Sequence, residues 1–194
     1  MESDDYSLSG AEIERLGKRI KRPIVLVGMM GVGKTSVGKR LANALHMPFV
    51  DSDEAIENAA KMSIPEMFER YGEPYFRDGE RRVIARLIDD GSETDRRKVI
   101  ATGGGAFVNP ATRTLILDRA IAVWLDSDVE TLVERVSRKD SRPLLRDGDP
   151  HEILRRLRTE REPFYAEAPI KVISGNAPHG KTVNTVLKGI AAWL

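Results

Sequence analysis

Residues 28–35 read Gly-Met-Met-Gly-Val-Gly-Lys-Thr. The apolar run Ile24–Val27 precedes them, and the segment Thr35–Leu45, which we predict to be a helix, follows them. This is the pattern G-x-x-x-x-G-K-[ST] between a strand and a helix, as the motif requires. Glycines there let backbone N–H groups surround phosphate oxygens, and the helix N-terminus favours an anion. The stretch predicts a site for a nucleoside triphosphate and magnesium.

Two side chains of this loop have predicted roles. Lys34 would place its charge on the β- and γ-phosphates, and Thr35 would offer its hydroxyl to Mg²⁺. The expected nucleotide-binding set also contains Gly31, Val32, Gly33 and Ser36. The alternative is a glycine-rich turn with an exposed lysine, and the complete motif with both flanks in place argues against it.

Short runs rich in Val and Ile alternate with longer amphipathic segments along the rest of the chain. The predicted strands are Ile24–Val27, Pro48–Val50, Val99–Ala101, Ile121–Leu125 and Ile170–Ile173. The other predicted helices are Ser63–Tyr71, Pro74–Asp89, Pro110–Leu117, Val129–Ser137, Pro150–Arg161 and Lys181–Leu194. Nearly continuous apolar strands between helices indicate an α/β fold, with a parallel sheet covered by helices on both faces.

Composition narrows the class of protein. The 194 residues are enough for about one domain, which we place at 22–194 after an extension over 1–21. Lys and Arg number 31 against 30 Asp and Glu, so a nucleic-acid partner is not expected. Cysteine is absent, which excludes thiolate chemistry. The acidic start and the lack of an apolar run of about 20 residues lead us to expect a cytoplasmic protein without a membrane segment; we expect a monomer.

The extension itself carries a helical pattern. Ile13, Leu16 and Ile20 recur at helical spacing, which predicts a short amphipathic helix before the first strand. This segment is either a frayed tail or a helix packed on the domain; the alternative is a partner-docking or regulatory role.

The second strand leads into Asp51-Ser52-Asp53. Alternate strand residues point the same way, so Asp51 and Asp53 are predicted to face one side at the carboxyl end of the strand, where such sheets bind ligands. One carboxylate could hold Mg²⁺ through water, and the other could accept the proton of an attacking hydroxyl. Alternatively, Ser52 or Asp53 caps the helix that follows.

Two further features point to an anionic substrate. Arg77 stands among apolar and aromatic residues, which suits bidentate capture of a carboxylate or phosphate. The alternative is a surface arginine paired with Asp78 or Glu80. The third strand ends in Gly103, Gly104 and Gly105, which would let a ligand approach the backbone, or would form a flexible turn.

The polar segment 138–150 is predicted to be a mobile lid. Its Arg142 could swing over the phosphates as the lid closes, or could be a solvated loop charge. In the next helix Arg161, beside Phe164 and Tyr165, is the best candidate for substrate contact.

Taken in order, G-x-x-G-x-G-K-T, D-x-D, F-R-x-x-E, G-G-G, R-P-L-L and E-R-x-P-x-Y resemble the shikimate kinase family over roughly 22–180. The resemblance implies a P-loop kinase fold with a five-stranded parallel sheet, a substrate-binding segment at about 54–82 and a lid at about 135–150. It implies transfer of phosphate from ATP, with Mg²⁺, to the 3-hydroxyl of shikimate, a step of aromatic amino acid biosynthesis.

The resemblance also implies roles for single residues. Asp53 would bind shikimate hydroxyls and act as the base, while Arg77 and Arg161 would hold the carboxylate. Gly103–Gly105 would touch the substrate through their backbone.

On the nucleotide side, the resemblance places Asp51 near magnesium, Arg142 on the phosphates and Arg135 against adenine. The stretch 174–180 departs from the family's adenine-contacting turn, although its proline is present. Two alternatives stay open: a related kinase such as a gluconate kinase, and a nucleotide-binding regulatory module without catalysis.

Overall fold

Five short strands form a single parallel sheet in the part of the chain that the structure, a computed structural model, describes, which is residues 7–89, 96–137, 148–175 and 179–194. The strands are β1 (Ile24–Val27), β2 (Phe49–Asp51), β3 (Val99–Ala101), β4 (Ile121–Asp126) and β5 (Ile170–Ile173). Their order is β2-β3-β1-β4-β5. The predicted parallel sheet is confirmed, and it differs from the prediction by one residue at the ends of β2 and β4.

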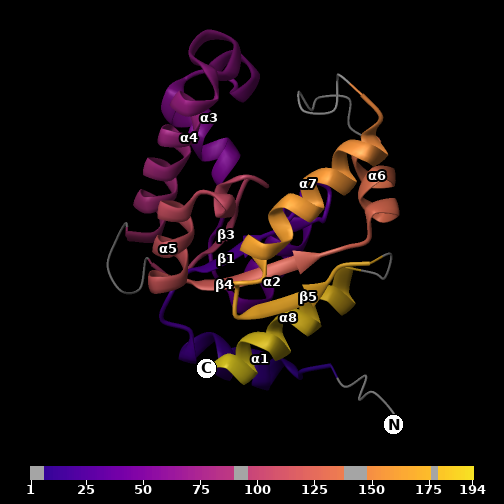
Figure 1. Ribbon diagram of the computed structural model, residues 1–194. Helices are drawn as coiled ribbons and strands as arrows, with labels where there is room; N and C mark the ends of the chain where they lie inside the picture. The colour runs from indigo at the N-terminus through magenta and orange to yellow at the C-terminus, as the bar shows by residue number, and fades with distance from the viewer. Residues whose placement is uncertain (1–6, 90–95, 138–147, 176–178) are drawn as a thin grey trace.

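Helices connect the strands and cover both faces of the sheet (Figure 1). They are α1 (Gly10–Arg19), α2 (Lys34–Leu45), α3 (Ser52–Ala60), α4 (Ile64–Asp89), α5 (Pro110–Arg119), α6 (Val129–Ser137), α7 (Pro150–Tyr165) and α8 (His179–Trp193), with a 3₁₀ turn at Ala106–Val108. Helices α1, α2 and α8 lie together below the sheet in Figure 1, while α3 and α4 stand opposite α6 and α7 above it. In the described ranges no helix is both long and apolar enough to cross a bilayer.

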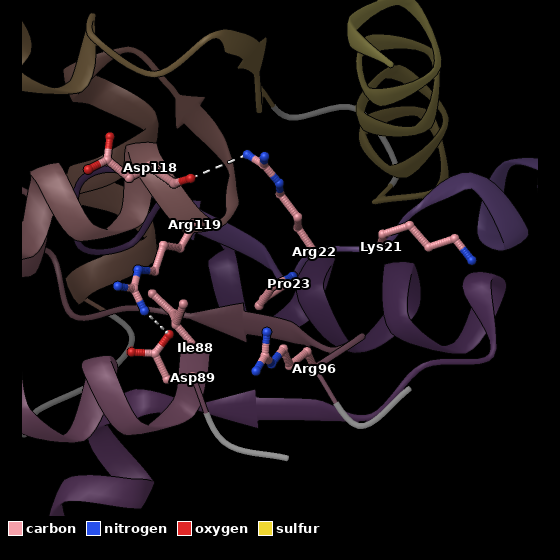
Figure 2. A pocket seen from close by; sticks show the side chains of 8 residues that line it. All are labelled: Lys21, Arg22, Pro23, Ile88, Asp89, Arg96, Asp118 and Arg119. Atoms are coloured by element: carbon pink, nitrogen blue, oxygen red, sulfur yellow. Dashed lines mark hydrogen bonds and ion pairs between the residues drawn. The ribbon is translucent and has the colours of Figure 1, made fainter. Parts of the chain in front are cut away.

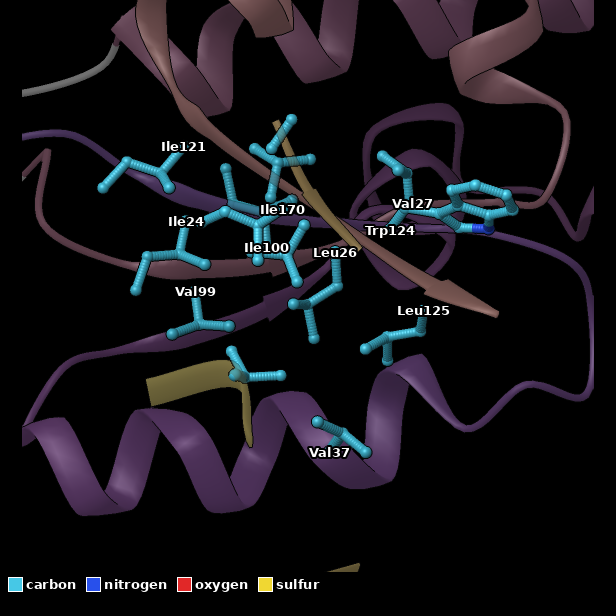
Figure 3. Packing of buried hydrophobic residues seen from close by; sticks show 14 of the residues in the cluster. Ile24, Leu26, Val27, Val37, Val99, Ile100, Ile121, Trp124, Leu125 and Ile170 are labelled. Carbon is cyan, nitrogen blue, oxygen red and sulfur yellow. The ribbon is translucent and has the colours of Figure 1, made fainter. Parts of the chain in front are cut away.

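The core lies on both faces of the sheet, with α2 and α8 on one side and α4, α5 and α7 on the other. All four residues of β1 are buried, because this central strand is covered on both faces. Figure 3 shows side chains of β1, β3 and β4 packing together, with Val37 of α2 closing the layer from one side. Burial of this layer fixes the carboxyl ends of β1, β2 and β3 side by side, and the candidate site is built there.

Helix α1 packs on this core rather than standing away from it. Leu16 and Ile20 are buried in the main cluster, and Ser9 and Glu12 form a capping box at the helix start. The Arg97 guanidinium donates to the Gly17 carbonyl at 2.6 Å, and the Leu8 amide donates to Asn184 at 3.1 Å. The amphipathic helix predicted from the sequence is confirmed, in its packed form.

Helix α4 contains the break that the sequence predicts between two helices. Gly72 has φ 78° and ψ 172°, which is not helical, and Pro74 follows it. The positive φ favours glycine at this position. The break separates a first part that packs with α3 from a second part that carries Arg77 and Glu80.

Candidate active site

The phosphate loop, Gly28–Thr35, curls around its own lysine. The Lys34 ammonium donates to the carbonyls of Gly28 and Met29, each at 2.8 Å, and the side chain is buried. Gly31 and Gly33 have φ of 81° and 99°, which side chains rarely adopt. The loop continues directly into the N-terminus of α2. The backbone amides of the loop and of the first turn of the helix therefore form one anion-binding site. The arrangement suits a chain of phosphates.

Thr35 and Asp51 meet beside the loop, as the magnesium prediction requires. The Thr35 hydroxyl donates to Asp51 Oδ2 at 2.8 Å. A hydroxyl and a carboxylate are hard oxygen ligands, which Mg²⁺ prefers, and such sites take their other ligands from water and phosphates. The residues present therefore fit Mg²⁺ held jointly with a nucleotide.

The two aspartates reach the site differently from the sequence prediction. Strand β2 ends at Asp51, so Asp53 lies in the first turn of α3 and strand alternation does not place it. Asp51, rather than Ser52 or Asp53, is the N-cap, and its Oδ1 accepts from the Asp53 amide at 3.1 Å. The capping alternative was therefore wrong about the residue. The tight helix start turns Asp53 away from Asp51 and toward the end of β3.

Gly103–Gly105, which we call the glycine turn, lies where four elements converge. A Cβ on Gly103 would stand 2.9 Å from both Asp53 Oδ1 and Glu80 Oε1. A Cβ on Gly105 would stand 2.6 Å from the Arg77 guanidinium nitrogens. The turn is glycine because the functional side chains occupy the space that its own side chains would need.

The same turn also meets the phosphate loop and α7. A Cβ on Gly104 would stand 3.3 Å from the Met30 amide nitrogen and 3.4 Å from Arg161 Nη1. The buried Ser52 hydroxyl accepts from the Gly103 amide at 3.3 Å, which fixes the turn to the start of α3. The structure thus brings Asp53, Arg77, Arg161 and the glycine turn together next to the phosphate loop.

Arg77 is paired, but not as a surface arginine. Its guanidinium bonds Glu80 at 2.8 Å and Glu73 at 3.0 Å, and Glu80 is only 2% exposed. Burial disfavours both charges and raises the pKa of Glu80, against the opposing effect of Arg77. Burial, the largest single effect, would lower the pKa of Arg77, but the charges and hydrogen bonds of Glu80 and Glu73 together outweigh it and the pKa is raised. Asp78, the other predicted partner, instead bonds the exposed Arg81 and Arg82.

Glu80 and Tyr165 are the site residues that sequence reasoning did not single out. Glu80 appeared only as a possible partner of Arg77, and Tyr165 only as a neighbour of Arg161. A signal existed for each: Glu80 lies three residues after Arg77 and Tyr165 four residues after Arg161, so each shares a helix face with its arginine. Burial, which only the structure gives, separates them from ordinary helix-surface residues.

The remaining predicted nucleotide contacts are partly described. The Arg135 guanidinium, on α6, donates to the carbonyls of Val32 at 3.2 Å and Gly175 at 2.7 Å, so it joins the phosphate loop to the segment after β5. Val32 is buried and Ser36 lies in the first turn of α2. Arg142 and most of the predicted lid lie outside the described residues.

A concavity at the amino ends of β1 and β4, opposite the candidate site, has a different chemistry. It is lined by Lys21, Arg22, Pro23, Ile88, Asp89, Arg96, Asp118 and Arg119 (Figure 2). Helices α4 and α5 both end there. Arg22 donates to the Asp118 carbonyl at 3.3 Å, and Arg119 bonds Asp89 at 2.7 Å. Helix C-termini carry partial negative charge on their unpaired carbonyls, which favours cations nearby. This explains the basic cluster, and no bound ligand is needed to explain it.

Comparison with known proteins gives one answer. A family model described as shikimate kinase matches residues 30–191. The chain is 67% identical to a shikimate kinase of Novosphingobium aromaticivorans, over 100% of both chains. The structure of an Acinetobacter baumannii shikimate kinase in complex with shikimate superposes with a TM-score of 0.79 at 35% identity, covering 91% of this chain and 97% of that one.

A more distant neighbour shares the fold alone. A gluconokinase of Sinorhizobium meliloti has a TM-score of 0.57 at 17% identity, covering 89% of this chain and 93% of that one. The architecture is therefore common to kinases of different acids, and the fold by itself does not select the substrate.

Proposed function

The chain belongs to the shikimate kinase family, and on that premise we propose that shikimate binds at the glycine turn between Arg77 and Arg161. The protein is a transferase that moves a phosphoryl group from ATP to shikimate, a step of aromatic biosynthesis. This sets aside gluconate as the substrate and a non-catalytic regulatory role. The observation that carries the proposed site is the convergence of two guanidinium groups and Asp53 on a side-chain-free turn beside the phosphate loop.

The two arginines supply recognition of the acid. Each guanidinium can make bidentate hydrogen bonds to a carboxylate, and together they select an acid over a neutral ring. A substrate without the carboxylate would leave the partly buried charge of Arg77 without that partner. Glu80 holds Arg77 from the buried side, so the guanidinium is oriented before substrate arrives.

Asp53 is proposed to act as the general base. It lies against the glycine turn, and the phosphate loop is adjacent at Met30. A hydroxyl held there can pass its proton to the Asp53 carboxylate as its oxygen attacks the γ-phosphorus of ATP. The bond from that phosphorus to the β–γ bridging oxygen then breaks, and ADP leaves. Lys34 neutralises charge on the phosphates, and Arg142 is proposed to add to this from the lid. Since phosphoryl transfer has a loose transition state, positioning and charge stabilisation supply most of the rate.

Magnesium is proposed to be held by Thr35 directly and by Asp51 through water. When bound, the ion would supply positive charge that neutralises the charge developing on the phosphates. The bond between Thr35 and Asp51 fixes both oxygens before the nucleotide binds. Arg135 is proposed to lie against adenine, supported by its bonds to the segment after β5.

The carboxylate assignment is tested by pairing a changed substrate with a changed arginine. With wild-type protein, replacing shikimate by its carboxamide should lower kcat/KM strongly, because the amide cannot pair with two cations. Arg77→Ala should raise the KM for shikimate about 10–100-fold, as expected for a lost hydrogen-bonded charge pair. It should also reduce the difference in kcat/KM between shikimate and its carboxamide. Arg81→Ala, an exposed arginine on the same helix, is the control.

The proposal would be contradicted if Arg77→Ala lowered kcat/KM for shikimate and for its carboxamide by the same factor. In that case the residue would support the fold and would not read the carboxylate. ADP release with gluconate in parallel checks the acid itself; turnover with shikimate and not with gluconate is expected.

We also propose that the enzyme is cytoplasmic, and that it works as a monomer on the basis of its balanced charge of +1. Light scattering after gel filtration should give a mass near the chain's 21.6 kDa. A mass of twice that value would contradict the monomer.

A further inference from the structure

Tyr165 is a buried polar side chain that the mechanism above does not use. It ends α7, and only 1% of it is exposed. Its hydroxyl donates to the carbonyl of Gly104, the middle residue of the glycine turn. A tyrosine hydroxyl has one proton to donate, so this bond commits it to the turn.

The same hydroxyl also interacts with Arg161. Arg161 precedes Tyr165 by one helical turn, so both side chains lie on one face of α7. The Arg161 guanidinium reaches the residue of the turn that Tyr165 bonds, since its Nη1 would stand 3.4 Å from a Cβ on Gly104, and its charge opposes the rise in the pKa of Tyr165. Tyr165 and Arg161 therefore meet at Gly104, more than fifty residues away in the chain.

Two further neighbours hold the ring in place. Met29 Sδ, in the phosphate loop, lies 3.9 Å from the Tyr165 hydroxyl oxygen, and the Trp124 ring of β4 lies 6.0 Å away, centroid to centroid. Burial raises the pKa of Tyr165 to about 12, although the charges of Arg161 and Arg77 oppose the rise. The hydroxyl therefore keeps its proton at any pH at which the enzyme would be assayed.

We propose that Tyr165 is a positioning residue for shikimate, and that its hydroxyl sets the place of the Arg161 guanidinium relative to the glycine turn. The inference rests on the proposed binding of shikimate by Arg161 and the turn. Without the hydroxyl, the carbonyl of Gly104 loses its buried donor, and the Arg161 guanidinium loses the polar group beside it at the turn. Both would then shift, and the carboxylate would meet a less well-oriented site.

The test is Tyr165→Phe, which keeps the ring and removes only the oxygen. We expect the KM for shikimate to rise about 5–10-fold, the size expected for one lost hydrogen bond in a charged network. The KM for ATP should change less than about twofold, since the phosphate loop keeps its own bonds. Tyr75→Phe, at an exposed tyrosine, is the matched control and should change neither constant.

The split between constants separates positioning from mere structural support. A purely structural hydroxyl would lower the fraction of folded enzyme, which reduces the maximal rate and leaves both KM values unchanged. Calorimetric titration of shikimate into the variant gives the affinity independently of turnover. If the variant melts early, the titration is made with saturating ADP, because a ligand of the folded state stabilises it.

The outcomes distinguish the role of Tyr165 from the proposed binding of shikimate at the carboxylate site. A raised dissociation constant for shikimate with an unchanged one for ADP supports the inference. An unchanged shikimate affinity overturns it, and so does a variant that fails to fold even with ADP. Arg161→Lys is run in parallel: if it leaves the shikimate KM unchanged, the proposed carboxylate site itself is wrong, whereas a large rise there with no effect of Tyr165→Phe overturns the role of Tyr165 alone.

Discussion

The phosphate loop and the glycine turn lie next to each other but are built in opposite ways. The phosphate loop consists of eight consecutive residues, and its lysine bonds the loop's own carbonyls. The glycine turn has almost no groups of its own: its chemistry arrives from α3, α4 and α7. A loop held by its own backbone should tolerate distant changes, whereas an assembled site should respond to any neighbour that moves.

The largest effect is expected where the two regions act on the same reaction. Asp53→Asn should lower kcat by about 10²–10⁴, the usual contribution of a general base, while the KM for ATP stays near the wild-type value. Coupled measurement of ADP release gives both constants. Glu54→Gln, an exposed acid beside it, is the control. Wild-type turnover in Asp53→Asn would remove Asp53 from the reaction.

The assembled nature of the glycine turn is tested by a single methyl group. In Gly105→Ala, the new Cβ would stand 2.6 Å from the Arg77 guanidinium, which is too close. The guanidinium would move away, since it is the flexible end of a long side chain. We expect the shikimate KM to rise about 5–20-fold, comparable to losing one charged hydrogen bond, with little change in the KM for ATP.

The matched change is Gly79→Ala, where a Cβ meets nothing within 4 Å. It should leave both KM values alone and raise helix stability by up to about 1 kcal/mol. Equal behaviour of the two alanines would break the comparison, since the turn would then not depend on its neighbours.

The independence of the phosphate loop is tested by a substitution in α1, which packs on the core away from the loop. Leu16→Ala opens the packing of α1 on the core that carries α2, and should lower the free energy of unfolding by about 2–4 kcal/mol. Denaturant titration measures this loss, with exposed Arg15→Ala as control. Both KM values should stay unchanged in the folded fraction. A raised KM for ATP would show that the loop depends on distant packing after all.

The smallest effect is expected from the exposed charges of α4. Arg82→Ala removes an ion pair with Asp78 in which both side chains are more than half exposed. Solvent screens such pairs, so neither KM should move, and the melting temperature should stay close to that of the wild type. A measurable rise in the shikimate KM would extend the assembled site onto the outer surface of α4.

The sequence predicts most of the fold because its signals are local. Strand β1 and α2 flank a motif that admits one arrangement, and the break at Gly72 is visible in the chain as Gly-Glu-Pro. The prediction for Asp53 fails because strand alternation competes there with the capping of a helix. The strand ends at Asp51 because that residue caps α3, and so alternation does not reach Asp53.

The sequence by itself determined the phosphate loop, the order of the strands along the chain, most of the helices between them and, through the order of its motifs, the family. Those features depend on spacing along the chain, and spacing is all that a sequence contains. Only the tertiary structure decided that Arg77 is held by a buried Glu80, that Asp53 and Arg161 meet at the glycine turn, and that Tyr165 bonds this turn. Burial and convergence depend on distances between residues far apart in the chain, and these are fixed only once the sheet and its helices pack.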